Sequence, residues 1–158
     1  MSMKDFVALL HALTGAGAII ASIMAKGQIG IPEEPVKSLG FGIFVVGSLL
    51  FAWSLLHLRG AFTGNVDPVT NRLVTTGPYR FVRHPVYLAM IGMVFGLAIG
   101  LRSVLGIALI VLTFIPSAIC RARLEEAALE EKFGDAWIAY RSRTRFILPL
   151  ICWCGLAA

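Results

Sequence analysis

The chain has 158 residues, of which 58% are hydrophobic and only 15% are charged, and its mean hydropathy is +0.82. These values exclude an ordinary water-soluble domain and predict an all-α, polytopic helical membrane protein. The net charge of +5 is better explained by membrane orientation and by anionic lipid than by nucleic acid, so no nucleic-acid partner is expected.

Four apolar runs have the length that a helix needs to cross a hydrocarbon core. They occupy residues 6–25, 38–58, 85–101 and 103–120. The first run has no positive cluster ahead of it and no small-residue cleavage site after it, so we expect a retained span and not a signal peptide. The runs predict one membrane domain over residues 1–158, in which residues 1–60 form two scaffold spans.

The first run is rich in small residues, namely Gly15, Ala16, Gly17, Ala18 and Ala21. Small residues let helices approach closely in lipid, so this run is expected to pack tightly against other spans. It also contains an isolated histidine, His11, for which we expect a hydrogen bond to a neighbouring helix in preference to a functional role.

The second run ends at Arg59 and Gly60, a cation and a glycine that suit the carboxyl end of a helix. His57 lies near that end and is expected at the membrane interface rather than in contact with a ligand. Residues 61–76 are rich in turn-forming residues and predict a surface loop.

The third run carries Gly92, Gly96 and Gly100 at a spacing of four, which puts them on one face of a helix. Two interpretations stay open: close packing against another helix, which is preferred, or room for a bulky cofactor. Only Arg102 separates the third run from the fourth, which predicts a tight antiparallel hairpin. Pro116 predicts a kink near the inner end of the fourth run.

Residues 120–133 are nearly all strong helix formers, so the fourth helix is expected to continue into the cytoplasm until Gly134 ends it. Asp135 is then expected to cap a short helix through Tyr140, with its apolar members Trp137 and Ile138 at the headgroup boundary.

The tail of the chain, residues 146–156, is apolar but too short to span, so it should pack back on the domain or lie in the interface. The cysteines are Cys120, Cys152 and Cys154, an odd number without the paired spacing of zinc or redox sites. We therefore expect neither a disulfide framework nor a metal site.

The positive charges predict the orientation, because Lys and Arg accumulate on the cytoplasmic side of membranes. With a cytoplasmic amino terminus, eleven Lys and Arg residues lie in cytoplasmic segments, and only three lie outside, namely Lys26, Lys37 and Arg102. We expect an integral protein of the cytoplasmic (inner) membrane whose polar stretches both face the cytoplasm.

Two polar stretches border the third and fourth runs. The first, residues 75–89, brings together Tyr79, Arg80, Arg83, His84 and Tyr87. The second holds Arg121, Arg123, Glu125 and Glu126. As an ordinary helical ion pair, Arg121 and Glu125 would contribute only about 0.2–0.5 kcal/mol. Contacts with lipid phosphate are an alternative explanation for the arginines.

A resemblance adds to this pattern. The run from Gly77 reads Gly-Pro-Tyr-Arg-Phe-Val-Arg-His-Pro-Val-Tyr, and it is followed by Arg123-Leu-Glu-Glu, Phe133-Gly, Tyr140 and Arg145-Phe-Ile-Leu-Pro. Together these motifs resemble the isoprenylcysteine carboxyl methyltransferase family and the related phospholipid methyltransferases, over residues 72–149. The resemblance implies a membrane enzyme that uses S-adenosylmethionine, without a metal, to methylate a lipophilic substrate. The cofactor would lie between the two polar stretches, in a pocket formed by the cytoplasmic helical extension.

The resemblance also implies residue roles. It places in the cofactor site Tyr79, Arg83, His84, Pro85, Tyr87, Glu125, Glu126 and Tyr140. It places Arg123, together with Arg121 and His84, at the reacting end. A carboxylate acceptor would be held by Arg123 or Arg121, whereas an amine or thiol would give its proton to His84 or a glutamate. The family usually has glycine two residues after the tyrosine, where this chain has Ala89.

Two other interpretations remain open. Steroid and sterol reductases resemble the carboxyl-terminal arrangement but use a nicotinamide dinucleotide such as NADPH. A non-catalytic membrane scaffold or a small-molecule permease would instead use the arginines to hold lipid and the glycines to pack helices. In the leading interpretation the partners are a lipophilic substrate, entering laterally from the bilayer, and the membrane lipids themselves.

Overall fold

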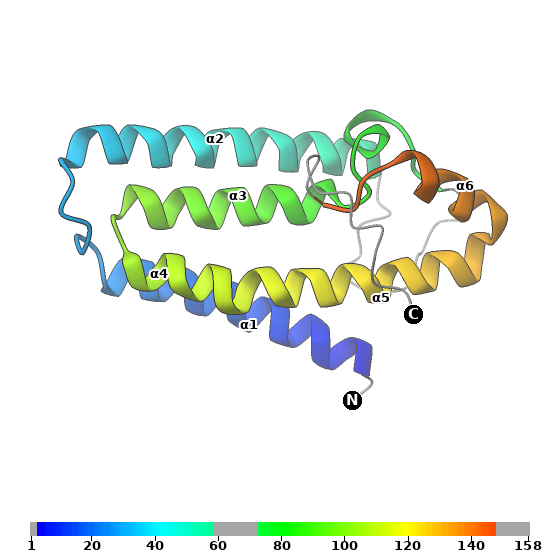
Figure 1. Ribbon diagram of the computed structural model, residues 1–158, viewed down its shortest axis with the longest axis horizontal. Coiled ribbons are helices and arrows are strands. Elements are labelled where there is room, and N and C mark those ends of the chain that lie inside the picture. The colour runs from blue at the N-terminus through cyan, green and yellow to red at the C-terminus, as the bar shows by residue number, and fades with distance from the viewer. Residues whose placement is uncertain (1–2, 59–72, 148–158) are drawn as a thin grey trace.

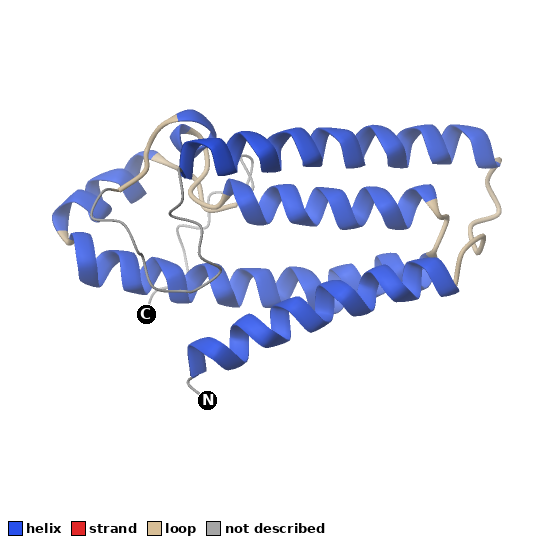
Figure 2. Cartoon of the chain, turned by 180° about the vertical axis from the view of Figure 1, so that it is seen from behind, coloured by secondary structure: helices blue, strands red, loops and turns tan. Residues whose placement is uncertain are grey.

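A computed structural model of the protein describes residues 3–58 and 73–147, and these residues are almost entirely helical (Figures 1 and 2). The elements are α1 (Met3–Met24), α2 (Glu33–Leu58), the 3-10 turn η1 (Gly77–Arg80), α3 (Pro85–Gly100), α4 (Val104–Leu109), the π-helical turn η2 (Ile110–Phe114), α5 (Ile115–Phe133) and α6 (Asp135–Arg143). Because α4, η2 and α5 follow one another without a break, they form one helix of 30 residues.

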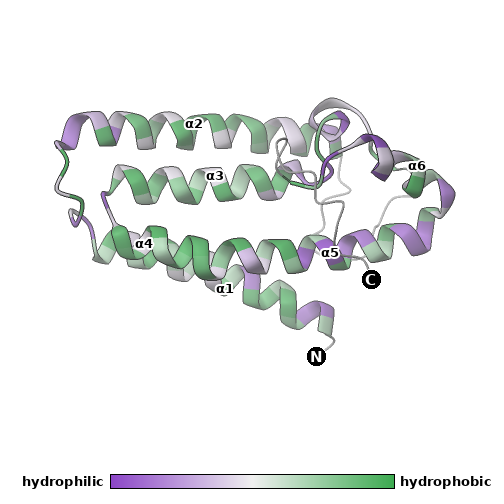
Figure 3. Cartoon of the chain, viewed as in Figure 1, coloured by the Kyte–Doolittle hydropathy of each residue, from purple (hydrophilic) through white to green (hydrophobic). Residues whose placement is uncertain are grey.

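The described residues contain three helices long and apolar enough to cross a membrane, namely α1, α2 and Val104–Phe133. The fourth expected span, α3, is apolar but only 16 residues long. The expectation of about four membrane helices in an all-α fold is therefore confirmed in outline. Apolar side chains such as Phe41, 69% exposed, lie on the surface of the long helices, as contact with lipid requires. The long helices are predominantly hydrophobic along their length (Figure 3).

Helices α2 and α3 lie side by side because glycines remove the side chains between them (Figure 1). A Cβ atom on Gly96 would lie 2.6 Å from the backbone nitrogen of Phe44, and one on Gly47 would lie 2.9 Å from that of Met93. Gly92 and Gly100 also face α2, where their nearest neighbours are Gly47 and Gly40. The glycine face is thus a helix contact, and the alternative of a cofactor against this face is wrong.

Helix α1 packs against the long helix through small residues, as expected. A Cβ atom on Gly15 would lie 2.9 Å from the ring of Phe114, and Gly106 lies directly against Ser22. His11 is buried at this contact, where its Nδ1 lies 3.0 Å from Ser117 Oγ. The expected hydrogen bond to a neighbouring helix is confirmed.

The end of the bundle remote from α6 is closed by two short connections that bond to each other. Arg102 adopts a left-handed conformation (φ 55°) in the turn between α3 and α4, and Ser103 caps α4 by accepting from Gly106 N at 3.1 Å. Gly27 N donates to Leu101 O at 2.9 Å, and Ile29 N donates to Arg102 O at 3.1 Å. The predicted tight hairpin is therefore confirmed.

Near Pro116, where the sequence predicted a kink, the long helix contains η2, a wider turn that ends two residues before the proline. Proline lacks an N–H and crowds the carbonyl four residues earlier, and a π-helical turn relieves both constraints.

Gly134 ends α5, with φ 50°, as expected. Asp135 is the first residue of α6 rather than its cap, and the helix runs three residues past Tyr140. Trp137 is only 1% exposed, so its expected place at the headgroup boundary is wrong, whereas Ile138 is 52% exposed and its place there stays a prediction. Its ring packs inward next to Tyr140, with 5.6 Å between ring centroids.

Candidate functional site

The candidate site lies at the end of the bundle where η1, the start of α3, the second half of α5 and the segment after α6 meet (Figure 1). Gly77 has φ 61° and begins η1, and a Cβ atom there would clash with the imidazole of His57. His84 then stands at the amino-terminal cap position of α3 and Pro85 at its first turn, where a missing N–H costs nothing. The turn formed by residues 77–84 places the side chains of Arg83 and His84 next to α5.

A short backbone ladder fixes residues 81–84 against the segment that follows α6. Arg83 N donates to Arg145 O at 2.7 Å, His84 N to Phe146 O at 3.2 Å, and Arg145 N to Phe81 O at 3.3 Å. Val82 and Arg145 form an isolated parallel bridge. The first residues of the tail thus pack back on the domain, as expected, while residues 148–156 lie outside the described part of the chain.

Glu126, on α5, is the acidic centre of the cluster. Its Oε1 atom lies 2.5 Å from Arg83 Nε and 3.3 Å from His84 Nε2. All three side chains are largely buried, so the charges interact through a medium that screens them weakly. Two donors on one carboxylate oxygen hold the start of α3 against α5.

Arg83 also bonds to backbone carbonyls beyond α5. Its Nη1 atom donates to Thr144 O at 2.5 Å and to Arg141 O at 3.1 Å. The Phe146 ring packs at a centroid distance of 5.2 Å from His84, and the guanidinium of Arg83 lies 5.7 Å from the same ring. One guanidinium therefore ties the end of α6 and the following segment to Glu126.

Glu125, the second carboxylate, lies beside Tyr87 and Arg121. Tyr87 donates its hydroxyl hydrogen to Glu125 Oε1 at 2.5 Å, and Arg121 Nε lies 3.5 Å from the same oxygen. The other oxygen, Oε2, lies 3.8 Å from His84 Nδ1. His84 therefore stands between the two glutamates, and Tyr87 and Arg121 complete the group on the side of Glu125.

A pair of tyrosines forms the outer wall of this cluster. Tyr140 donates its hydroxyl hydrogen to Tyr79 O at 2.7 Å, which connects α6 to η1. Burial raises the pKa of Tyr140 to about 12, and burial next to Tyr140 and Glu125 raises the pKa of Tyr79 as well. Both phenols are therefore neutral hydrogen-bonding groups at any physiological pH.

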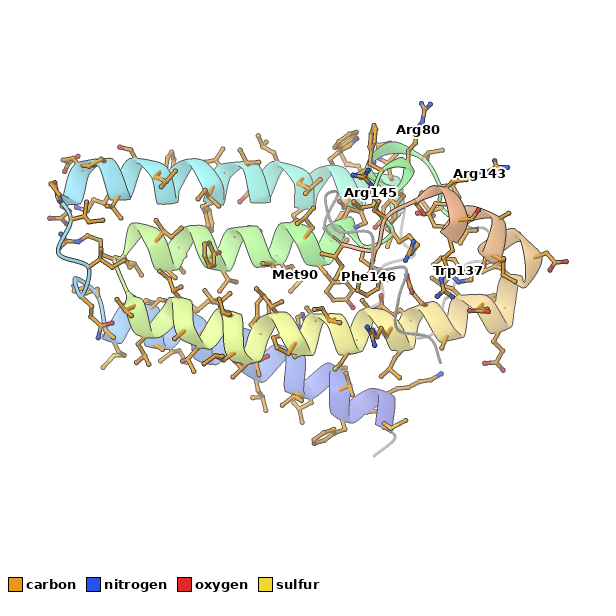
Figure 4. The ribbon with its side chains drawn as sticks, viewed as in Figure 1. Arg80, Met90, Trp137, Arg143, Arg145 and Phe146 are labelled. Atoms are coloured by element: carbon orange, nitrogen blue, oxygen red, sulfur yellow. The ribbon has the colours of Figure 1, made fainter. Side chains whose placement is uncertain are left out.

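A surface cleft of about 540 Å³ borders this wall at Tyr140. Its polar lining consists of Thr75, Arg80, Tyr140, Arg143 and Thr144, and two alanines of α6 complete it. Two arginines and no acidic residue face the cleft, so it suits an anionic group. Arg80 and Arg143 project away from the bundle, whereas Trp137 points toward α5 (Figure 4).

The fold brings together most of the residues expected in the site. Direct contacts join Arg83, His84, Tyr87, Arg121, Glu125 and Glu126, while Tyr79 and Tyr140 form the adjacent wall and the fully buried Pro85 supports it. Arg123 lies on the exposed side of α5, whereas Arg121, two residues earlier, is half-buried and faces Glu125. Ala89 is fully buried, and its carbonyl oxygen faces Gly47 of α2.

Sequence reasoning missed the role of the segment after α6. The carbonyls of Arg141 and Thr144 and the ring of Phe146 all contact Arg83 or His84. The run Arg145-Phe-Ile-Leu-Pro was the available signal, but it did not indicate which element it would meet. Among the described residues, no group of three or more His, Cys, Asp or Glu side chains is arranged to hold a metal ion.

Comparison with known proteins gives the family. Residues 36–136, well over half of the chain, match the phospholipid methyltransferase family. The chain is also similar to the protein-S-isoprenylcysteine O-methyltransferase of Schizosaccharomyces pombe, with 29% identity over 160 residues. That alignment covers 92% of this chain but only 65% of the yeast protein, so the chain spans less than two thirds of its relative. The helical membrane architecture, the paired polar stretches and the match over residues 36–136 agree, and the chain belongs to the phospholipid methyltransferase family.

Proposed function

We propose that this protein transfers a methyl group from S-adenosylmethionine to a lipophilic acceptor at the membrane surface. The observation that carries the proposal is the pair of half-buried Glu125 and buried Glu126, held by Arg83, His84 and Tyr87 at the polar end of a membrane bundle. The names of the matched family and of the yeast relative support the reaction class.

The side chains at this end fit the charges of the methyl donor. S-adenosylmethionine carries a cationic sulfonium and ammonium and an anionic carboxylate, and it supplies an electrophilic methyl group. Glu125 and Glu126 provide negative charge for the cationic groups, and Arg80 and Arg143 in the adjacent cleft provide positive charge for a carboxylate. The cleft volume of about 540 Å³ lies in the range of small-molecule sites.

In this proposal the donor is held by the residues named from the sequence: Tyr79, Arg83, His84, Pro85, Tyr87, Glu125, Glu126 and Tyr140. The protein's task is to bind and orient, because methyl transfer is an in-line displacement that needs alignment and the exclusion of water. The buried ring of Tyr87 and the half-buried ring of Phe146 cover His84 and exclude water beside it. His84, between two carboxylates, is the group placed to receive a proton.

For a carboxylate acceptor, Arg121 is better placed than Arg123, because it already borders Glu125 inside the cluster. We propose the cytoplasmic face of the inner membrane as the site of reaction on the strength of the charge distribution. The family match favours methyl transfer over hydride transfer from a nicotinamide dinucleotide and over a purely structural scaffold.

Calorimetric titration of the purified protein with S-adenosylhomocysteine tests the proposal. We expect binding at micromolar to millimolar concentration, and a separate titration with NADPH should give no heat. His84→Ala and Glu126→Ala should each weaken binding at least tenfold, equivalent to about 1.4 kcal/mol. Glu131→Ala, which removes an exposed acid from the same helix, is the matched control and should bind like the unsubstituted protein.

Folded protein that gives no heat with millimolar S-adenosylhomocysteine would rule out the proposed function, and heat with NADPH would favour a reductase. Unchanged affinity in both His84→Ala and Glu126→Ala would rule out this site while leaving the reaction open. The acceptor class is then found by incubating membranes with methyl-labelled S-adenosylmethionine and identifying the labelled lipid or peptide.

A further inference from the structure

The cleft between η1 and α6 carries positive charge that no acidic side chain in its lining balances. Arg80 and Arg143 line this cleft, and both are exposed. Among the described residues neither of them forms an ion pair, whereas Arg141, two residues before Arg143, pairs with Glu130 at 3.3 Å. Two guanidinium groups on one cleft attract an anion, and the planar fork of each can hold two oxygens of a phosphate.

The cleft lies at the level where a membrane span ends. Gly77, at the start of η1, packs directly against the imidazole of His57 in the last turn of α2. Helix α2 is apolar enough to cross a membrane, and near this end it exposes Trp53, a residue type enriched at the boundary between membrane and water. Arg80 follows Gly77 by three residues and points outward from the bundle (Figure 4). The cleft is therefore at the depth of lipid headgroups.

An exposed aromatic side chain beside the cleft favours a lipid over a free anion. Phe81 directly follows Arg80 and is 63% exposed. Its backbone is fixed on both sides, because Phe81 N donates to Pro78 O at 3.1 Å and Phe81 O accepts from Arg145 N at 3.3 Å. A large apolar ring held outward in this way is unfavourable in water and favourable among acyl chains. Arg80 and Phe81 thus suit the phosphate and the apolar part of one lipid.

The lining of the cleft also selects the headgroup. A zwitterionic lipid carries an ammonium group next to its phosphate, and the described lining offers two arginines that repel this group and no carboxylate that would receive it. A headgroup that carries hydroxyls instead, such as that of phosphatidylglycerol, meets only complementary groups, because Thr75 and Thr144 line the same cleft.

We propose that this cleft binds the phosphate of an anionic membrane lipid with a hydroxyl-bearing headgroup, with Arg80 and Arg143 on the phosphate and Phe81 among the acyl chains. The inference goes beyond the proposed function and does not rest on it, since it involves no methyl transfer. A donor carboxylate in the same cleft would neutralise only one of the two positive charges, so the other remains for the lipid.

Native mass spectrometry of the purified protein in detergent measures lipid affinity directly. The protein is titrated, without S-adenosylhomocysteine, with phosphatidylglycerol or with phosphatidylcholine of the same acyl chains, and it should bind phosphatidylglycerol more tightly. Arg80→Gln and Arg143→Gln should each weaken phosphatidylglycerol binding about fivefold, the effect of one lipid-attracting charge. Arg141→Gln is the matched control, because it removes the same charge from an exposed position of α6 outside the cleft, and it should change the affinity less than about twofold.

Two further measurements separate a lipid from a free anion. Phe81→Ala should weaken phosphatidylglycerol binding at least about threefold, because it removes apolar contact with the acyl chains. Millimolar inorganic phosphate should leave the bound lipid in place. Displacement of the lipid by inorganic phosphate, or an unchanged affinity in Phe81→Ala, would overturn the assignment to a lipid.

Equal affinities of the unsubstituted protein for the two lipids would refute the proposal without any variant. Equal losses in Arg143→Gln and Arg141→Gln would refute it as well, because the charge of α6 as a whole, and not the cleft, would then attract the lipid. All four substituted side chains are exposed, so the variants should fold, and circular dichroism checks this.

Discussion

Arg83 concentrates the polar contacts of the site in one guanidinium group. It contacts Glu126 through Nε and the carbonyls of Arg141 and Thr144 through Nη1. The planar fork of arginine makes such divergent bonds, which a lysine ammonium cannot reproduce with the same geometry. At the scale of single residues, Arg83 is therefore expected to contribute more to stability than any exposed arginine.

Replacing Arg83 by alanine should lower the free energy of unfolding by about 3–5 kcal/mol, because Glu126 would keep a buried charge without its closest partner. Denaturation in mixed micelles, followed by circular dichroism, measures the change. Arg141→Ala is the control, since it keeps the carbonyl that Arg83 uses and removes only an exposed ion pair to Glu130, which contributes about 0–1 kcal/mol. Similar losses in the two variants would mean that Arg83 acts only as a surface charge.

A second residue-scale prediction concerns Tyr87. Tyr87→Phe keeps the ring next to His11 but removes the hydrogen bond to Glu125, which as a bond to a charged group contributes about 1.5–3 kcal/mol. We expect a fully folded protein that binds S-adenosylhomocysteine more weakly, measured by calorimetry. An affinity equal to that of the unsubstituted protein would show that Glu125 needs no partner from α3 to bind the donor.

The sequence predicted most of the side chains that meet in the site, but it did not predict how His11 is bonded. Arg83, His84, Glu125 and Glu126 were expected together because their motifs border the same two spans. The unpaired Nε2 of His11 was not foreseen, because the sequence cannot show that one ring nitrogen has a partner among the described residues and the other does not. That distinction depends on the rotation of α1 against α5, which many side-chain contacts set together.

At the scale of elements, the glycine contact between α2 and α3 orients the start of α3, which carries His84 and Tyr87. Gly96→Ala should destabilise the protein, because the added methyl group would lie 2.6 Å from a backbone atom of α2 that cannot move aside. A loss of about 1–3 kcal/mol is expected in mixed-micelle denaturation.

Gly42 provides the matched control for this prediction. It lies in the same helical pair, but a Cβ atom there would have no neighbour within 4 Å. Gly42→Ala should therefore be neutral, or stabilising by up to about 1 kcal/mol through the higher helix propensity of alanine. If Gly96→Ala were as stable as Gly42→Ala, the close approach of α2 and α3 would be in doubt.

Helices and their ends were the most predictable elements, since apolar runs, glycines and prolines act locally. The long helix ends at Gly134 and the hairpin turns at Arg102, as the sequence indicated. The inward orientation of Trp137 was not predictable, because α6 is short and its burial depends on where it packs against α5. The π-helical turn before Pro116 likewise reflects a balance between a local constraint and continuous packing along α1.

At the scale of the whole molecule, the bundle has two chemically different ends. The amino terminus, η1 and α6 lie at one end, and the α1–α2 connection with the α3–α4 turn lies at the other (Figures 1 and 3). The sequence predicted this separation. In a bundle of four antiparallel helices, the first and third connections lie on one side and the second connection lies on the other. The side of the membrane at which each end lies remains a prediction from charge.

Labelling of single cysteines with a membrane-impermeant maleimide tests this orientation. In a variant with Cys120, Cys152 and Cys154 replaced by serine, Lys26→Cys introduces a thiol in the exposed α1–α2 connection, and Ser142→Cys introduces one on the exposed side of α6. Eleven of the fourteen Lys and Arg residues lie in the segments expected to be cytoplasmic, so in intact cells the maleimide should label Lys26→Cys and not Ser142→Cys. After permeabilisation both should react, because both positions are exposed in the folded protein. Labelling of Ser142→Cys alone in intact cells would invert the topology and put the Glu125–Glu126 pair outside, away from the cytoplasmic supply of S-adenosylmethionine.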